Sequence, residues 1–202
     1  MTVARLEDAG SGLVPVTPGW FVVNAEQAAW VENDAFGARC VFESSPRVLA
    51  ERPELEPQRF EQLGITLTVI QPGKPSGLYH SESAQEDFLV LAGECVALIE
   101  GEERPLRRWD FVHCPPGTEH SFVGAGAGPC VLLMVGARLE GKALFYPRSE
   151  LALRHHGGVE EGTASPRDAY APFPQWRLGR SEWAIVDSNH GPPPYQSGAL
   201  TN

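Results

Sequence analysis

Residues 79–93 read Tyr-His-Ser-Glu-Ser-Ala-Gln-Glu-Asp-Phe-Leu-Val-Leu-Ala-Gly, and this stretch decides the fold. His80 and Glu82 are two residues apart, so on an extended backbone their side chains point to the same face. Glu86 follows, and Phe88 continues its face with apolar bulk. An imidazole and two carboxylates on the inside of a sheet are costly to bury unless they are paired or bind a cation. The stretch therefore predicts a metal-binding strand.

A second imidazole, His120, lies 27 residues after the end of that stretch, in the run Cys-Pro-Pro-Gly-Thr-Glu-His-Ser-Phe of residues 114–122. We expect His80, Glu82, Glu86 and His120 to form one metal site. For each histidine alone, the alternative is a structural imidazole bonded to backbone. Glu82 has three alternatives: it ligates the metal, supports the ligands from outside, or acts as a general base beside the metal.

Composition narrows the class of protein. The 202 residues, 42% hydrophobic and 21% charged, predict a globular protein with a real core. A net charge of -10 argues against a nucleic-acid partner, because phosphate binding needs clustered Lys and Arg. No apolar run approaches the ~20 residues that span a bilayer, and residues 1–20 show no secretory signal. We therefore expect no membrane partner and a cytosolic location. The 4 cysteines, far apart in sequence, are expected to be reduced and buried.

The spacing of apolar runs predicts an all-β architecture. Short strands separated by Gly and Pro turns indicate a sandwich or small barrel rather than a parallel α/β fold. Expected strands span residues 19–24, 29–33, 37–43, 65–71, 95–100, 103–107, 110–114, 120–123 and 129–135.

The chain changes character after residue 137. One short helix is expected over 146–155, and Ser165 followed by Pro166 predicts the start of a second. The remaining tail carries Phe173, Trp176, Trp183 and Tyr195, and is expected to pack along the barrel or against a neighbouring subunit.

These two segments resemble the two motifs of the cupin superfamily. Its first motif is Gly, a short spacer, His-x-His, three or four residues, Glu, six residues and Gly. Its second is Gly, five residues, Pro-x-Gly, two residues, His, three residues and Asn. In this chain His80, Glu86 and Gly93 match the first motif, and Pro115, Gly117 and His120 match the second. The chain departs from the pattern at Trp109 and Gly124, which stand in the first Gly slot and the Asn slot of the second motif.

The departure that bears on chemistry is Glu82, which stands where the family has its second histidine. The resemblance implies a divalent metal held by His80, Glu82, Glu86 and His120, a His2Glu2 site in place of the usual three His and one Glu. The ion would be Zn, Fe(II), Mn or Ni, since oxygen ligands disfavour Cu(I). The extra carboxylate lowers the charge of the site, which we expect to disfavour an anionic substrate.

The resemblance also implies the fold and the assembly. We expect a double-stranded β-helix, the cupin jelly-roll barrel, with short C-terminal helices and an extended tail. The expected parts are N-terminal strands and a connection at 1–64, the barrel core at 65–137 and the C-terminal segment at 138–202. Such barrels often pair through their N-terminal strands, so we expect a homodimer. The apolar stretches near Trp20, Trp30 and Phe42 are consistent with that pairing.

Three functions stay open at this point. The first is a small-molecule metalloenzyme of oxygenase, isomerase or lyase type, with Glu82 as ligand or catalytic base. The second is a non-catalytic module that binds or senses a small metabolite in the barrel. The third is a structural barrel with a vestigial site, because one fold hosts many unrelated activities. In the first two, we expect the cavity to be lined by Phe88, Val90, Phe122 and Met134, with Tyr79 and Trp109 at its rim.

Overall fold

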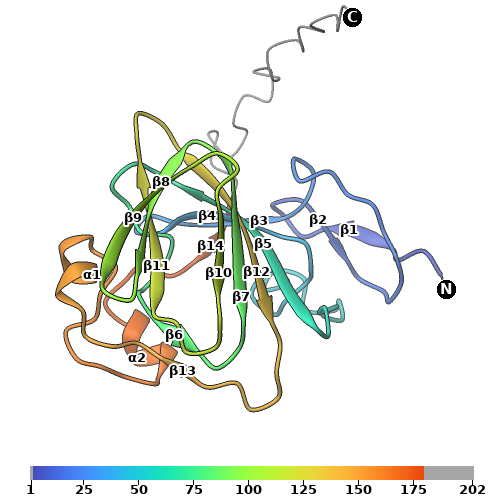
Figure 1. Ribbon diagram of the computed structural model, residues 1–202. Helices are drawn as coiled ribbons and strands as arrows, with labels where there is room; N and C mark the ends of the chain where they lie inside the picture. Colours follow the sequence, from blue (N-terminus) through green and yellow to red (C-terminus); the bar gives the residue numbers. More distant parts are fainter. Residues whose placement is uncertain (1, 180–202) are drawn as a thin grey trace, which may run out of the picture.

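The protein is built mainly of antiparallel strands in a computed structural model that describes residues 2–179 (Figure 1). In this part of the chain a large sheet has the strand order β10-β7-β12-β5-β4-β3-β14, and a small sheet has the order β11-β8-β9. The all-β fold expected from the sequence is confirmed.

The strands have the following bounds. The large sheet consists of β10 (Phe111–Cys114), β7 (Glu86–Ala92), β12 (Cys130–Ala137), β5 (Leu63–Ile70), β4 (Gly37–Val41), β3 (Trp30–Asn33) and β14 (Arg177–Leu178). The small sheet consists of β11 (His120–Ala125), β8 (Glu94–Ile99) and β9 (Glu102–Arg107). Two short pairs lie outside them, β1 (Leu6–Asp8) with β2 (Leu13–Pro15) and β6 (Ser81–Glu82) with β13 (Leu144–Phe145).

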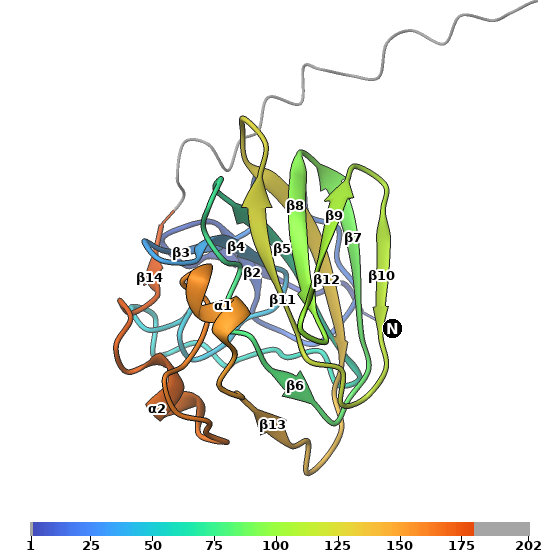
Figure 2. The same ribbon diagram turned by 60° about the vertical axis from the view of Figure 1, so that its left-hand side comes forward.

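The two sheets enclose a common apolar core (Figure 2). Phe88 and Val90 of β7 pack with Phe122 of β11 and with Leu132 of β12, and all four side chains are buried. Phe88 and Val90, alternate residues of β7, thus face the interior, as the period of two in the sequence predicts. Three of the cysteines, Cys95, Cys114 and Cys130, belong to the same core, and all four are buried.

Two short helices, α1 (Glu150–Arg154) and α2 (Pro166–Tyr170), cover one side of the barrel (Figure 1). The Ser165 hydroxyl caps α2 by accepting a hydrogen bond from the Asp168 amide, as predicted. The first helix is shorter than the predicted span 146–155. It begins only after Ser149, whose hydroxyl caps it, because Tyr146 instead pairs as an isolated β-bridge with Thr163.

Part of the N-terminal segment continues the large sheet. Strands β3 and β4 join it through β5. The strand expected at 19–24 does not form, and Trp20 makes only an isolated bridge to Val3. Trp30 is buried in the chain's own core whereas Trp20 is 52% exposed. The tail residues Trp183 and Tyr195 lie outside the described residues.

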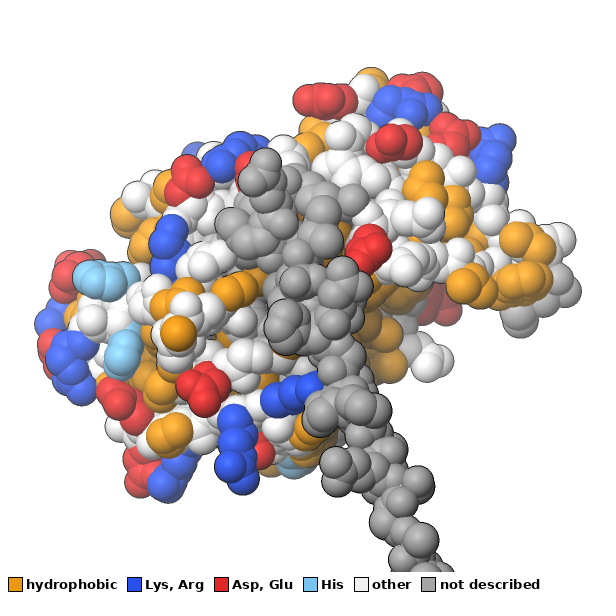
Figure 3. Space-filling model, turned by 90° about the horizontal axis from the view of Figure 1, so that it is seen from above, with side chains coloured by type: hydrophobic (Ala, Val, Ile, Leu, Met, Phe, Trp, Pro, Cys, Tyr) orange, Lys and Arg blue, Asp and Glu red, His pale blue; other side chains and the backbone are white. Residues whose placement is uncertain are grey.

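Figure 3 shows acidic and basic side chains interspersed on one face, with hydrophobic side chains among them. Among residues 2–179, no helix is long and apolar enough to span a bilayer.

Gly93 marks the corner where the chain passes from β7 in the large sheet to β8 in the small one. Its φ is 70°, and an added Cβ would lie 2.3 Å from the Pro129 carbonyl oxygen. Gly101 also has a positive φ of 78° but has nothing within 4 Å of such a Cβ. Gly93→Ala should therefore lower the free energy of unfolding by about 3 kcal/mol or more, against about 1 kcal/mol for Gly101→Ala. Urea unfolding of both variants measures the difference, and equal losses would contradict this account of the corner.

Candidate metal centre

The two motif histidines are held together by their own backbone. His80 and His120 form an isolated antiparallel bridge in which each amide donates to the other's carbonyl, with N–O distances of 3.1 and 2.8 Å. His80 lies just before β6, and His120 is the first residue of β11. Their rings are 4.9 Å apart between centroids. Two segments separated by forty residues of sequence are thus fixed side by side before any side-chain interaction is counted.

The orientation of both rings is set by the same local contact. His80 Nδ1 lies 2.8 Å from the Leu78 carbonyl oxygen, and His120 Nδ1 lies 3.0 Å from that of Thr118. A carbonyl only accepts, so each Nδ1 carries the proton, and the Nε2 of a neutral ring presents a lone pair. Both Nε2 atoms are therefore assigned as acceptors, which is the form that ligates metal ions.

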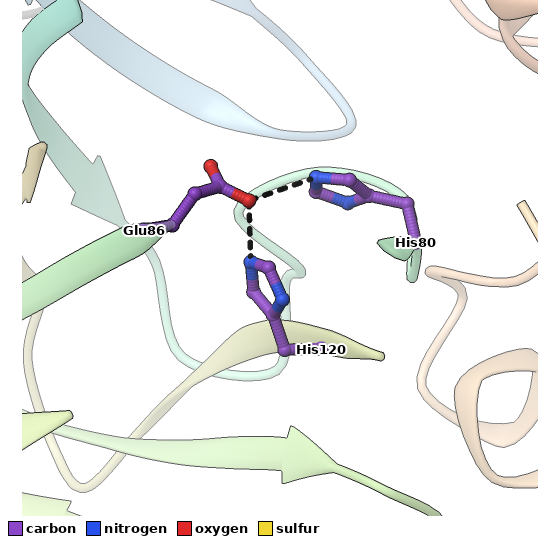
Figure 4. A group of neighbouring side chains, drawn as sticks. All are labelled: His80, Glu86 and His120. Atoms are coloured by element: carbon purple, nitrogen blue, oxygen red, sulfur yellow. Dashed lines mark ion pairs between the residues drawn. The ribbon is translucent and has the colours of Figure 1, made fainter. Parts of the chain in front are cut away.

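Glu86 points at both of these lone pairs (Figure 4). Its Oε2 lies 3.3 Å from His120 Nε2 and 3.8 Å from His80 Nε2. Among residues 2–179, Oε2 is also a buried oxygen with no hydrogen-bond partner. Three electron-rich atoms thus converge with no donor between them. Gly136 lies opposite Glu86 on β12, and a Cβ there would make only an ordinary contact with Oε1, at 3.5 Å.

A divalent cation fits this arrangement. Donor atoms about 2.1 Å from one ion, at angles of 90–110°, are about 3.0–3.5 Å apart. The ligand atoms of His80, Glu86 and His120 all lie within 4.8 Å of one another. The three side chains therefore need to move only slightly to bind one ion together. The donor set, two neutral imidazoles and a carboxylate, suits Zn, Fe(II), Mn or Ni.

Burial shifts the pKa values of Glu86, His80 and His120 toward their neutral forms. It raises the pKa of Glu86 to about 7, with a further contribution from the charge of Glu82. It lowers the pKa of His80 to about 4, with His120 adding to the effect, and it also lowers the pKa of His120. Without a cation, the site therefore favours neutral groups, because burying the ionised forms is costly.

Glu82 is near this group but is held by a partner of its own. Its Oε1 lies 3.9 Å from His80 Nε2, and its Oε2 accepts a 2.6 Å hydrogen bond from Lys142 Nζ. Strand β13, just after Lys142, pairs with β6, which carries Glu82. The lysine thus orients the carboxylate at the edge of the histidine pair and offsets its charge.

The site opens onto a cavity of about 380 Å³. Phe88, Phe122 and Met134 line it as expected, but Val90 is fully buried in the core between the sheets. The two residues expected at the rim do not line it. Tyr79 is 1% exposed and packs against Leu98 and α1, while Trp109 is 62% exposed.

Sequence reasoning missed several polar residues that share this cavity, namely Arg39, Lys142, Tyr146 and Tyr170. For Arg39 a signal existed, since the residue lies inside an expected strand between Ala38 and Cys40, where a charge is unusual. The other three come from the segment after the barrel, and no periodicity tied that segment to the motifs.

Comparison with protein families shows to which family the barrel residues belong. The family described as Cupin domain matches residues 66–136. Residues 66–136 are a cupin domain. The resemblance seen in the two motifs is thereby confirmed, and this cupin domain contains His80, Glu86 and His120. A search of curated proteins finds no match.

Several solved structures resemble parts of the chain. One, from Acidithiobacillus ferrooxidans, is provisionally assigned as a sugar phosphate isomerase, with 28% identity and a TM-score of 0.41 over 53% of this chain and 64% of that one. A sugar phosphate isomerase from Silicibacter pomeroyi shows 26% identity and a TM-score of 0.41 over 46% and 65%. A DMSP lyase from Ruegeria pomeroyi shows 26% identity and a TM-score of 0.38 over 44% of each chain. The match thus spans less than two thirds of each of these proteins.

The raised pKa of Glu86 predicts how the metal-free protein responds to pH. A carboxyl whose folded pKa is about 7 rather than 4.5 destabilises the fold when ionised, and this penalty disappears as pH falls toward 4.5. In the presence of a chelator, Glu86→Gln should therefore be more stable than wild type at pH 8, by about 3 kcal/mol, and the two should converge at low pH. Urea unfolding at pH 5 and pH 8 measures this.

Asp87→Asn is the matched control, one residue along the same strand. A hydrogen bond to the His113 ring holds the pKa of Asp87 below its usual value, so its ionised form stabilises the fold. Removing that charge should lower stability at pH 8, the opposite sign to Glu86→Gln. A Glu86→Gln variant that is less stable than wild type at pH 8 without metal would contradict the buried-charge account.

Proposed function

We propose that this cupin binds one divalent metal ion and acts as a small-molecule metalloenzyme of oxygenase, isomerase or lyase type. The observation that carries the proposal is the convergence of two imidazole lone pairs on a buried carboxylate oxygen that has no donor among the described residues. Such a group is costly in a protein interior unless a cation binds there. The adjoining cavity gives a small substrate access to the same place.

In this proposal His80, Glu86 and His120 hold the ion, and Glu82 is either the fourth ligand or a base beside it. A bound divalent ion would polarise a carbonyl or hydroxyl oxygen of the substrate. Glu82 would take a proton from a group bound next to the ion, and its Oε1, 3.9 Å from His80 Nε2, and its hydrogen bond from Lys142 support this role. Phe88 and Phe122 exclude water from the inner side.

Three further parts of our interpretation remain proposals. One is the division into residues 1–64, 65–137 and 138–202. The second is a homodimer paired through the N-terminal strands, for which the buried Trp30 offers no surface while Trp20 does. The third is a cytosolic location.

Loss of either histidine should abolish metal binding. His80→Ala and His120→Ala should each weaken the metal by more than about 100-fold, since loss of outer partners alone already costs about 10- to 100-fold. Elemental analysis after dialysis, with titration calorimetry of the stripped protein, gives the values. His113→Ala is the control, because this imidazole is exposed and bonded to Asp87.

Substitutions of Glu82 then separate its roles. Glu82→Ala should retain part of the metal affinity, and Glu82→His should tighten it by restoring the three-histidine set. Full metal occupancy in both His80→Ala and His120→Ala would refute the proposed site.

An enzyme needs a coordination position open to the cavity, which a closed structural site lacks. In protein reloaded with Mn²⁺, exchange of bound water should increase the relaxation rate of the bulk water protons. The same ion in a closed four-ligand site should leave that rate near the value for buffer with an inert protein. A closed site in the wild-type protein would favour the structural barrel or the non-catalytic module instead.

A further inference from the structure

Two buried side-chain atoms in residues 2–179 lack a hydrogen-bond partner, and both belong to residues of the same cavity. One is Glu86 Oε2, and the other is Arg39 Nε. The proposed metal accounts for the first. Nothing in the metal centre accounts for the second, which belongs to a cationic group on β4. Buried polar atoms are rarely left unpaired in native structures, so this one needs its own explanation.

The guanidinium of Arg39 is fixed in place without a counter-ion. Its Nη2 donates a 2.6 Å hydrogen bond to the Ser76 carbonyl, and its Cζ lies 4.7 Å from the centroid of the Trp176 ring. Within the described chain, it forms no ion pair with a carboxylate. Burial lowers the pKa of Arg39, yet a guanidinium remains charged in proteins. The fold therefore holds an oriented positive charge that is available to an anion.

Some of the other charges of the cavity already have partners. Its acidic residues are Glu82 and Glu86, whereas its basic residues are Arg39, Arg59, Arg138 and Lys142. Two of these bases are already paired, Lys142 with Glu82 and Arg138 with Glu43. The sequence led us to expect that Glu82 would disfavour an anionic substrate, but Lys142 offsets that charge. With those two pairs set aside, Arg39 and Arg59 remain against Glu86, so the cavity favours an anion even before a divalent ion is bound.

We propose that Arg39 binds the anionic group, a carboxylate or a phosphate, of a small organic substrate whose other end reaches the metal centre. Only the second part of this assignment, that the substrate reaches the metal centre, rests on the proposed function. The anion site itself requires no metal. Arg39 is then a specificity-determining residue: its planar guanidinium matches the paired oxygens of either group.

A second cavity of about 380 Å³ also borders Arg39, on the side of Arg47 and Arg167. Those two arginines are exposed, so water already satisfies their charge. The metal cavity is the better place for the anion, because Arg39 shares it with Glu86, the proposed metal ligand. An anion bound to Arg39 there would lie in the same cavity as the metal. Arg47 nevertheless provides a matched control, since it lines the neighbouring cavity and not the metal cavity.

The test measures binding of succinate and of inorganic phosphate by titration calorimetry to chelator-treated protein in chloride-free buffer. Wild type should bind at least one of the two anions, and the tighter one identifies a carboxylate or a phosphate substrate. Arg39→Gln should raise its Kd at least tenfold, and Arg39→Lys should raise it by a smaller factor, because lysine keeps the charge without the planar fork. Arg47→Gln should stay within twofold of wild type.

Each contrary outcome overturns the proposal. These outcomes are a wild type that binds neither anion, an Arg39→Gln that binds as wild type does, or an Arg47→Gln that loses as much as Arg39→Gln. If Arg39→Gln does not fold, Arg39→Lys decides the matter by the same comparison. Metal retention is read separately on the same proteins, so that loss of the metal site and loss of the anion site are distinguished.

Discussion

The site depends on the reciprocal backbone hydrogen bonds between His80 and His120. They join the start of β11 to the segment before β6, and they place two rings at a fixed separation. Each ring then bonds through Nδ1 to the carbonyl two residues before it, of Leu78 or Thr118. The same local device thus determines both tautomers. The side chains need no further network to aim their lone pairs at one point.

Burial of the groups that the backbone brings together makes their charged forms costly. The Glu86 carboxylate faces those lone pairs, and its raised pKa expresses the cost of ionising it there. The protein offers two compensations of different kinds. Glu82 receives a lysine from the chain itself, whereas Glu86 has no such partner among residues 2–179. The carboxylate of Glu82 is thus stabilised by a cation of the protein itself, whereas that of Glu86 is left available to a ligand.

Much of the barrel could be predicted from the sequence, because alternation and turn residues act locally. The strands from residue 65 onward and the cap at Ser165 depend on near neighbours. The approach of His80 to His120 depends on a long-range pairing, which only the family resemblance supplied. Predictions failed where distant packing decides. Val90 turned to the core between the sheets, and residues 19–24 had no strand to pair with.

The metal group and the walls around it also come from different parts of the chain. The matched domain ends at residue 136, yet Lys142, Tyr146 and Tyr170 lie beyond that limit and line the cavity. Arg39 lies before its beginning. The barrel therefore supplies the candidate metal ligands, while its flanking segments line the cavity beside them. Mutations in those flanks could change ligand preference during evolution without altering the three candidate ligands, so that one inherited group could serve unrelated purposes.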